Sequence, residues 1–434
     1  MPLPIRSKLR DELISATADA LPDIEVRNEI FIVPDSARGL QAADSSLPQS
    51  GQLRETIENI LGETPFARFA TALITQELRD RSHYTESDTP KPLTAIAGYE
   101  NSSIAAERIV SAFESLPWDY KLSIEMPRAL GSQILAQMAS LDISETIRIF
   151  RPDATTATTF PLTTGDTKRD LSVTGNTLLG MAFPPTWQEA GAYVQIDASG
   201  FVGPFGDTPT IQTAVDTLKA VCGIGIALFA FEVNPTYRPW PTKAKFFAHR
   251  RCASHWVLER AYELDSDISA TFHDLVPSTI PILAAGDESY VRPFMMKNLA
   301  DASFVLSHAA KAARIVSASQ WLFDSYSSQR DLLSFVQAAI CIEILLGDKK
   351  TSDVIGLGEL LRNRLSYLIG VSHSQRDQLM SDFNKIYTLR SGIVHSGQSK
   401  FGSDERQLLG RLRWMCQRVI QEEVKLLQAD LKPE

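Results

Sequence analysis

The sequence predicts an α+β protein, with a mixed region over residues 1–290 and an all-helical region over residues 291–434. In the first region, stretches of helical periodicity are interspersed with stretches in which apolar and polar residues alternate. Beyond "ILAAGDESYVRP" (282–293) the helical pattern is almost continuous. The chain has 434 residues, 44% of them hydrophobic and 22% charged, which is enough for two or three domains with substantial cores.

The mixed region is expected to contain both helices and strands. Helical periodicity predicts helices at 5–20, 52–80 and 103–115. Alternation predicts strands at 25–33, 119–125, 145–150 and 192–202. Polar stretches rich in Pro and Thr predict loops at 83–97 and 152–170. These patterns leave the order of the strands undefined.

The C-terminal region is expected to fold as a helical bundle around its own core. Apolar periodicity predicts helices at 294–326, 329–347, 356–369, 374–391 and 404–430. The breaks between them fall at Gly347, at Gly370 and in the loop "SGQSKFGS" (396–403), where glycine and small polar residues interrupt the pattern.

Charge and cysteine content exclude several classes of protein. The net charge of −9 argues against a general nucleic-acid coat protein. The charge is uneven, however, because residues 330–434 carry a net +2 and the remainder a net −11. The four cysteines are scattered and form no CxxC pair, which argues against a disulfide framework. We expect no secretory signal, no membrane span and a cytoplasmic location, since the longest apolar run covers only about 221–231.

The segment "YTLRSGIVHSG" (387–397) holds an arginine and a histidine, Arg390 and His395, five positions apart. An ideal helix turns about 100° per residue, so the two side chains are separated by about 140° on a straight helix. They converge only if the helix bends or ends between them, or if a second copy of the chain supplies one of them. Gly392 is the residue that permits a bend.

Arg390 and His395 suit the cleavage of a phosphate ester. A guanidinium binds two phosphate oxygens and keeps its charge as the transition state forms. A histidine titrates near neutral pH and can take a proton from a ribose 2′-hydroxyl or give one to the leaving 5′-oxygen. Such a site needs neither metal nor other cofactor and favours RNA over DNA. The alternative is a surface helix with a solvated arginine and a capping histidine.

The surrounding sequence resembles the HEPN family (higher eukaryotes and prokaryotes nucleotide-binding), in particular its Apea-like subgroup from bacterial anti-phage defence. The resemblance runs from about Trp321 to about Leu427. It rests on "QAAICIEILLG" (337–347), "LGELLRNRLSYLIG" (357–370), "QRDQLMSDFNKIYTLRSGIVHSG" (375–397) and the final amphipathic helix. It implies a helical bundle that dimerises, with Arg390 and His395 as the catalytic pair of a metal-independent endoribonuclease. Ser391 matches the small polar residue that often follows the family's arginine.

Glu343 is a second indication of a site, because its carboxylate falls on the apolar stripe of the helix predicted at 329–347. A carboxylate there needs a partner. Arg390 is the functional candidate, whereas Arg362 or Arg364 would make a structural pair. Arg362, Arg364 and Lys385 are weak candidates for RNA binding, and solvated positions are the alternative for all three.

Other features of the sequence allow a structural interpretation. Tyr387, one turn before Arg390, either stacks on a base or packs in the bundle. In the last helix, Arg411 and Arg418 lie together opposite the apolar stripe, where a solvated face is the expectation and phosphate binding the alternative. "HRRCASHW" (249–256) spaces His249, Cys252 and His255 like a zinc site, but no fourth ligand is near, so we expect no metal. "GIG" (223–225) is expected to mark tight packing.

The leading functional hypothesis is an RNA-cleaving effector of anti-phage defence or toxin-type growth control. Its C-terminal bundle forms a homodimer or higher oligomer, and residues 1–290 sense a trigger, contact a protein partner or restrain the nuclease. Two alternatives remain open from the sequence. The bundle is a non-catalytic module that binds nucleotide, RNA or protein, or the chain is held silent by a separate neutralising protein.

Overall fold

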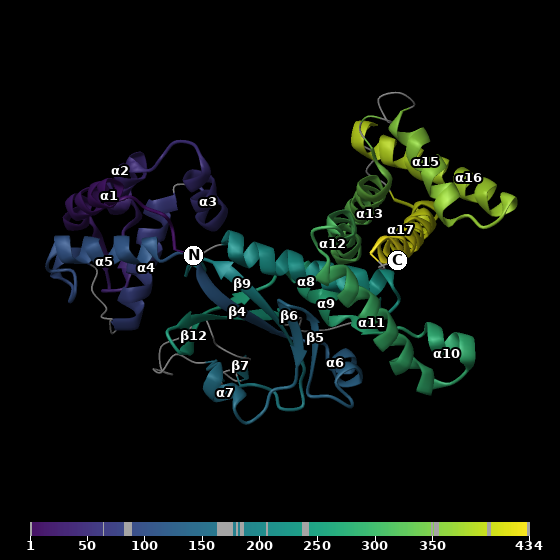
Figure 1. Cartoon of the computed structure of the whole chain (residues 1–434), viewed down its shortest axis with the longest axis horizontal. Coiled ribbons are helices and arrows are strands. Elements are labelled where there is room, and N and C mark those ends of the chain that lie inside the picture. The colour runs from purple at the N-terminus through teal and green to yellow at the C-terminus, as the bar shows by residue number, and fades with distance from the viewer. Residues whose placement is uncertain are drawn as a thin grey trace.

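The computed structural model describes residues 2–63, 65–81, 89–162, 177–178, 181–182, 186–204, 207–236, 243–348, 350, 356–396 and 401–431. It confirms the predicted α+β class, with sheets in the N-terminal part and helices alone in the described C-terminal part. Figure 1 shows a strand-rich part between an N-terminal helical lobe and the C-terminal helices.

The N-terminal lobe packs helices against a small antiparallel sheet of order β2-β1-β3. Its helices are α1 (Ser7–Ala20), α2 (Leu40–Ser46), α3 (Gln52–Leu61), α4 (Pro65–Arg81) and α5 (Ser102–Glu114), and its strands are β1 (Glu25–Arg27), β2 (Phe31–Ile32) and β3 (Lys91–Pro92). Short 3-10 helices cover Leu21–Asp23, Pro34–Gly39 and Leu93–Ala95. Phe66, Phe69 and Phe113 meet edge to face in its core.

Two predictions in this lobe are wrong in detail. The helix predicted at 52–80 is two helices, because Gly62 has φ +76° and ends α3. The strand predicted at 25–33 is a hairpin, since Asn28 and Glu29 adopt positive φ values of 53° and 63° and turn the chain between β1 and β2. The helices predicted at 5–20 and 103–115 are confirmed as α1 and α5.

The central part is an antiparallel sheet of order β12-β11-β4-β9-β6-β5. Its strands are β4 (Trp118–Glu125), β5 (Ser140–Ser144), β6 (Ile147–Phe150), β9 (Tyr193–Gly200), β11 (Lys245–Cys252) and β12 (His255–Glu263). The strands predicted at 119–125, 145–150 and 192–202 are therefore confirmed as β4, β6 and β9. The hairpin of β11 and β12 was not predicted.

Smaller elements surround this sheet. The short helices are α6 (Arg128–Ile134), α7 (Thr156–Thr159), α9 (Ser266–His273), α10 (Ile280–Ala285) and a 3-10 turn at Glu288–Tyr290. Two further antiparallel pairs join β7 (Thr177–Leu178) to β8 (Met181–Ala182) and β10 (Phe231–Val233) to β13 (Leu275–Pro277). The loops predicted at 83–97, 152–170 and 396–403 lie partly outside the described residues, and two of them are wrong in detail, because β3 and a 3-10 helix lie within the first and α7 lies within the second.

Helix α8 (Pro209–Ala227) links the sheet to the C-terminal helices, and it was also missed. The close approach predicted for "GIG" is confirmed. A Cβ on Gly223 would lie 1.9 Å from the carbonyl oxygen of Ser319, and one on Gly225 would lie 2.2 Å from the Phe231 ring. Both positions therefore need glycine.

The C-terminal helices are α11 (Val291–Ser307), α12 (Ala313–Ser327), α13 (Asp331–Leu346), α15 (Leu357–Ile369), α16 (His373–Ser396) and α17 (Ser403–Asp430). The helix predicted at 294–326 is two helices. Its break follows His308, whose carbonyl accepts the backbone N–H groups of Lys311 and Ala312 in a turn. The helix predicted at 374–391 runs on to Ser396, because Gly392 stays helical.

The described residues form three large hydrophobic cores and a small cluster at Leu258 and Ala261, and two of the large cores extend across the predicted domain boundary at residue 290. The first core belongs to the N-terminal lobe, with Phe201 from the central part. The second joins the sheet and α8 to Met295, Leu299 and Phe323. The third, in the bundle, includes Ile224 and Ala227 of α8. Helices on both sides of residue 290 thus share cores.

Candidate active site

Glu343 and Arg390 meet in the bundle, on α13 and α16. The Arg390 Nε lies 3.1 Å from Glu343 Oε1, and its Nη2 donates to Oε2 over 3.4 Å. Both side chains are largely buried, with 23% and 21% of their surfaces exposed. Of the alternatives that the sequence left open for Glu343, the structure shows Arg390 as the partner. The two parallel contacts fix the plane of the guanidinium.

The pair lies at the edge of a narrow crevice between α13, α15, α16 and α17. Glu343, Arg390 and Tyr387 are its polar lining, and the remainder is apolar: Ala339, Ile342, Leu361, Phe383, Ile386 and Leu412. The free space between these side chains is only about 10 Å³, so the crevice is nearly filled by its own walls. Among the described residues, the contacts of the Arg390 guanidinium use Nε and Nη2, and Nη1 has no hydrogen-bond partner.

His395 points to a different side of α16. Because the helix neither ends nor is interrupted before Ser396, about 140° separates His395 from Arg390. His395 is exposed and falls within roughly 40° of an exposed polar row on α16. That row comprises Asp377, Ser381, Asn384 and Thr388. Of the routes by which Arg390 and His395 could converge, an end of the helix between them is excluded. Ser391 lies half-buried beside Arg390.

The weak candidates for RNA binding occupy three different environments. Arg364 donates to the carbonyl of Leu346 over 2.8 Å and so caps the end of α13, which is a structural role. Arg362 donates to Asn384 Oδ1 over 3.3 Å and lies 3.6 Å from Glu359, which brings it to the polar row of α16. Lys385 is exposed on α16.

Tyr387 packs against other side chains of the bundle. Its ring stacks on Phe383 with centroids 6.2 Å apart, and a Cβ on Gly358 of α15 would lie 2.7 Å from it. The packing alternative therefore fits Tyr387 better than stacking on a base. Arg411 binds Asp382 over 2.9 Å and lies over the Trp414 ring, while Arg418 binds Glu422 over 3.2 Å, so neither is merely solvated.

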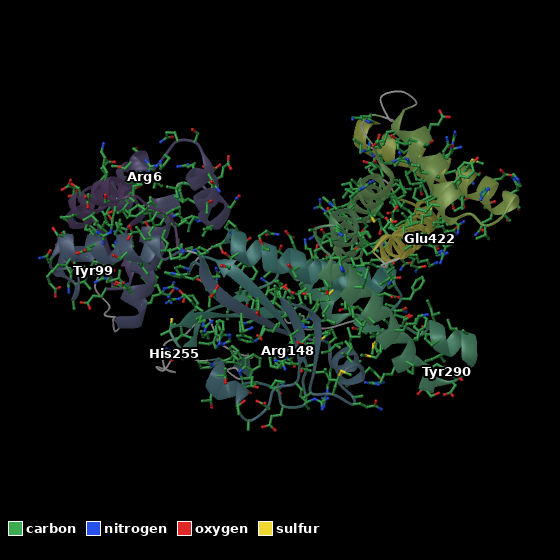
Figure 2. The ribbon with its side chains drawn as sticks, in the orientation of Figure 1. Arg6, Tyr99, Arg148, His255, Tyr290 and Glu422 are labelled. Atoms are coloured by element: carbon green, nitrogen blue, oxygen red, sulfur yellow. The ribbon has the colours of Figure 1, made fainter. Side chains whose placement is uncertain are left out.

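The zinc-like spacing of "HRRCASHW" is part of the β11–β12 hairpin, not of a helix. Cys252 and His255 face each other across its turn, where Ala253 has φ +53°. His249 is buried in β11, and its Nε2 lies 2.9 Å from the Pro161 carbonyl. Burial lowers the pKa of His249 to about 4. Figure 2 places His255 beside the sheet, well away from Glu422 in the bundle.

Within the described ranges, no three His, Cys, Asp or Glu side chains cluster closely enough to hold a metal ion. Nor does any helix in that part of the chain have the length and apolar character needed to cross a bilayer. Comparisons with protein-family models, with curated proteins and with solved structures found no match for this chain.

Proposed function

We propose that this chain is a metal-independent endoribonuclease of the HEPN type, with Arg390 and His395 as its catalytic residues. The bidentate contact between Glu343 and Arg390 is the observation that carries the proposal. A carboxylate among apolar side chains costs desolvation free energy, which an ion pair with good geometry must offset. Here the carboxylate fixes the plane of a guanidinium that lines a narrow crevice, and Nη1 is the nitrogen that would bind a phosphate oxygen.

The reaction follows from the chemistry of these groups. His395 takes the proton of a ribose 2′-hydroxyl, and the 2′-oxygen attacks the adjacent phosphorus. A new bond from the 2′-oxygen to phosphorus forms as the bond to the 5′-oxygen breaks. Arg390 stabilises the charge that builds on the phosphate oxygens. A protonated histidine returns a proton to the 5′-oxygen, and the product ends in a 2′,3′-cyclic phosphate.

The proposed active form is a homodimer through the C-terminal bundle. One chain offers one histidine in this motif, whereas the reaction uses both a base and an acid. The wide angle between Arg390 and His395 on α16 also favours a composite site. A two-fold axis brings His395 of a second copy toward Arg390 of the first. Sedimentation tests this arrangement, because a fully active monomer at low concentration would contradict it.

In this proposal, residues 1–290 regulate the nuclease in an anti-phage or toxin-type response. An unrestrained ribonuclease harms the cell that makes it, so a large attached region suits a sensing or restraining role. The trigger is a protein or another molecule that this region contacts.

The deciding experiment incubates the purified chain with labelled RNA in EDTA and analyses the product ends. We expect cleavage, 2′,3′-cyclic phosphate or 3′-phosphate ends, and no cleavage where the 2′-hydroxyl at the cut is replaced by hydrogen. Activity lost in EDTA, or products ending in a 3′-hydroxyl, would contradict the mechanism. RNA binding without cleavage would identify the bundle as a non-catalytic module.

A further inference from the structure

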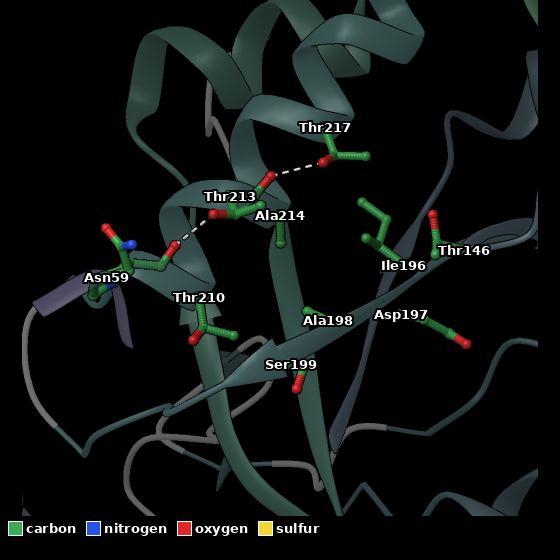
Figure 3. A pocket seen from close by; sticks show the side chains of 11 residues that line it. Asn59, Thr146, Ile196, Asp197, Ala198, Ser199, Thr210, Thr213, Ala214 and Thr217 are labelled. Atoms are coloured by element: carbon green, nitrogen blue, oxygen red, sulfur yellow. Dashed lines mark hydrogen bonds between the residues drawn. The ribbon is translucent and has the colours of Figure 1, made fainter. Parts of the chain in front are cut away.

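A polar groove lies far from the candidate active site, where the N-terminal lobe, the sheet and α8 come together. Its hollow measures about 280 Å³. Figure 3 shows Thr213 and Thr217 on α8 above the strand that carries Ala198 and Ser199. Asn59 of α3 stands at the left of this view, near Thr210 and Thr213. The volume is just below the roughly 300–1,000 Å³ of pockets that hold drug-sized ligands. A smaller molecule therefore fits it.

One edge of strand β9 is unpaired in this groove. Strand β6 runs beside β9 only as far as Thr146, whose carbonyl accepts the backbone N–H of Asp197 over 2.8 Å. Backbone groups of alternate residues point to the same side of a strand. Ser199 therefore directs its N–H and its C=O away from β4, into the space beyond β6. Neither group has a partner among the described residues.

Phe201, the next residue whose backbone N–H faces this side of the strand, shows how a side chain of the same protein can accept such an N–H. The backbone N–H of Phe201 donates to Thr210 Oγ1 over 2.8 Å. Gly200 makes this close approach possible, since a Cβ there would lie 2.1 Å from that oxygen. At Ser199 no side chain takes this role. A ligand that pairs with Ser199 must offer an acceptor and a donor side by side, as the amide-like edge of a nucleobase does.

The α8 wall of the groove offers hydrogen-bond acceptors that suit the hydroxyl groups of a ligand. The Thr213 hydroxyl donates to the Pro209 carbonyl over 2.8 Å, and the Thr217 hydroxyl donates to the Thr213 carbonyl over 2.7 Å. Their protons are thus used within the helix, and their oxygens remain as acceptors. A ribose supplies the matching donors.

The groove is close to neutral. No lysine or arginine is among its lining residues, and the one charged residue there, Asp197, has its carboxylate bound to Lys121 Nζ over 2.7 and 2.8 Å. A phosphate would find no lysine or arginine among the lining residues, and the neighbouring Lys121 is already paired with Asp197. We infer that the groove binds an uncharged nucleoside, whose base edge pairs with the Ser199 backbone and whose ribose hydroxyls contact Thr213 and Thr217.

Isothermal titration calorimetry of the full chain with adenosine, guanosine, cytidine and uridine in turn tests this inference. At least one nucleoside should bind with a dissociation constant of about 1 mM or tighter. Its 5′-monophosphate and free D-ribose should each bind at least about tenfold more weakly, because the first adds charge and the second lacks the base edge. A monophosphate or ribose that binds as tightly as the nucleoside overturns the assignment, as does the absence of binding by all four.

Variants locate the binding. Thr213→Trp places a large ring in the groove from an exposed position and should abolish binding. Gln212→Trp is the matched control, since Gln212 is the exposed neighbour on α8 that does not line the groove. Thr213→Val, which keeps the shape and loses the acceptor, should weaken binding about fivefold and serves if the Trp variant fails to fold. Unchanged affinity in a folded Thr213→Trp chain sinks the proposal. Because the readout is binding, it is independent of any RNA cleavage.

Discussion

The contact between Glu343 and Arg390 makes a measurable prediction about the free energy that couples them. If Glu343 holds the guanidinium in place, a double-mutant cycle with Glu343→Gln, Arg390→Gln and the double variant should give a favourable coupling energy. We expect about 1.5–2 kcal/mol. Exposed pairs typically give ~0.2–1 kcal/mol, and breaking a fully buried pair costs ~3–5 kcal/mol. A pair with 21–23% exposure and two parallel contacts lies between these limits.

The bundle contains a matched control for this cycle. Arg406 on α17 lies 2.8 Å from Asp331 on α13, so this pair also joins two helices, but its side chains are 64% and 40% exposed. Asp331→Asn and Arg406→Gln should show a coupling below about 0.5 kcal/mol. Any effect of Asp331 on the start of its own helix cancels in the cycle.

Native-state hydrogen exchange of amides in α13 and α16 is a suitable assay, because it reports local opening in a chain with several cores. A coupling for Glu343 and Arg390 no larger than that of the control pair would refute the orienting role of Glu343. On the proposed function, Glu343→Gln should also slow RNA cleavage by at least about tenfold, since Arg390 then loses its fixed orientation. Full activity in that variant would remove Glu343 from the site.

Three further predictions concern single residues. His395→Ala should reduce RNA cleavage ~10²–10⁴-fold while far-UV circular dichroism stays unchanged, because the proton-transfer group is lost; an active, folded variant would exclude this histidine. Arg390→Lys should retain little activity, since lysine keeps the charge without the planar fork, and near-normal rates would show that charge alone suffices. Burial lowers the pKa of His249 to about 4 in the folded chain, whereas an unfolded histidine has a pKa of about 6.5. The unfolded chain therefore binds this proton first as the pH falls, and roughly 3 kcal/mol of stability that is present above about pH 6.5 is lost as the pH approaches 4. His249→Phe should flatten that part of the stability profile in acid denaturation, and an unchanged profile would assign the acid sensitivity to other groups.

The sequence predicted the C-terminal helices well because each buries one regular apolar stripe. Four helices of the bundle, α13, α15, α16 and α17, were anticipated to within a few residues at most ends, and the errors lie in the merging of α11 with α12 and at the end of α16. The first break contains neither Gly nor Pro, and it is formed by backbone bonds to His308. The second error is the end of the helix predicted at 374–391: Gly392 was expected to permit a bend, whereas a helix tolerates an isolated glycine at a cost of ~1 kcal/mol and α16 continues to Ser396.

The residue types of the candidate site could be predicted from the sequence, but the packing of the helices that decides which residues pair could not. A carboxylate on an apolar stripe indicates a partner, and the structure identifies that partner as Arg390. That Arg364 caps α13 depends on where two helices meet, which no local pattern encodes. The groove beside Ser199 was not predicted at all, because it gathers residues from positions 59, 146, 196–199 and 209–217, none of which forms a motif. Helix α8 was also missed, and its C-terminal half, residues 220–227, is buried on every side and so shows no polar face.

The position of α8 matters for anyone who wishes to isolate the bundle. A fragment beginning at residue 291 would lack Ile224, Ala227 and Leu228, and it would expose the surface that these side chains cover. It would also lose the carbonyls of Ile226 and Ala227, which accept hydrogen bonds from Gln417 and Gln421. Because α8 also belongs to the core of the sheet, whose first strand is β4, the smallest fragment that folds should include residues 118–431. A shorter fragment should aggregate. A lack of RNA cleavage by such a fragment would then reflect misfolding and not the absence of a catalytic site.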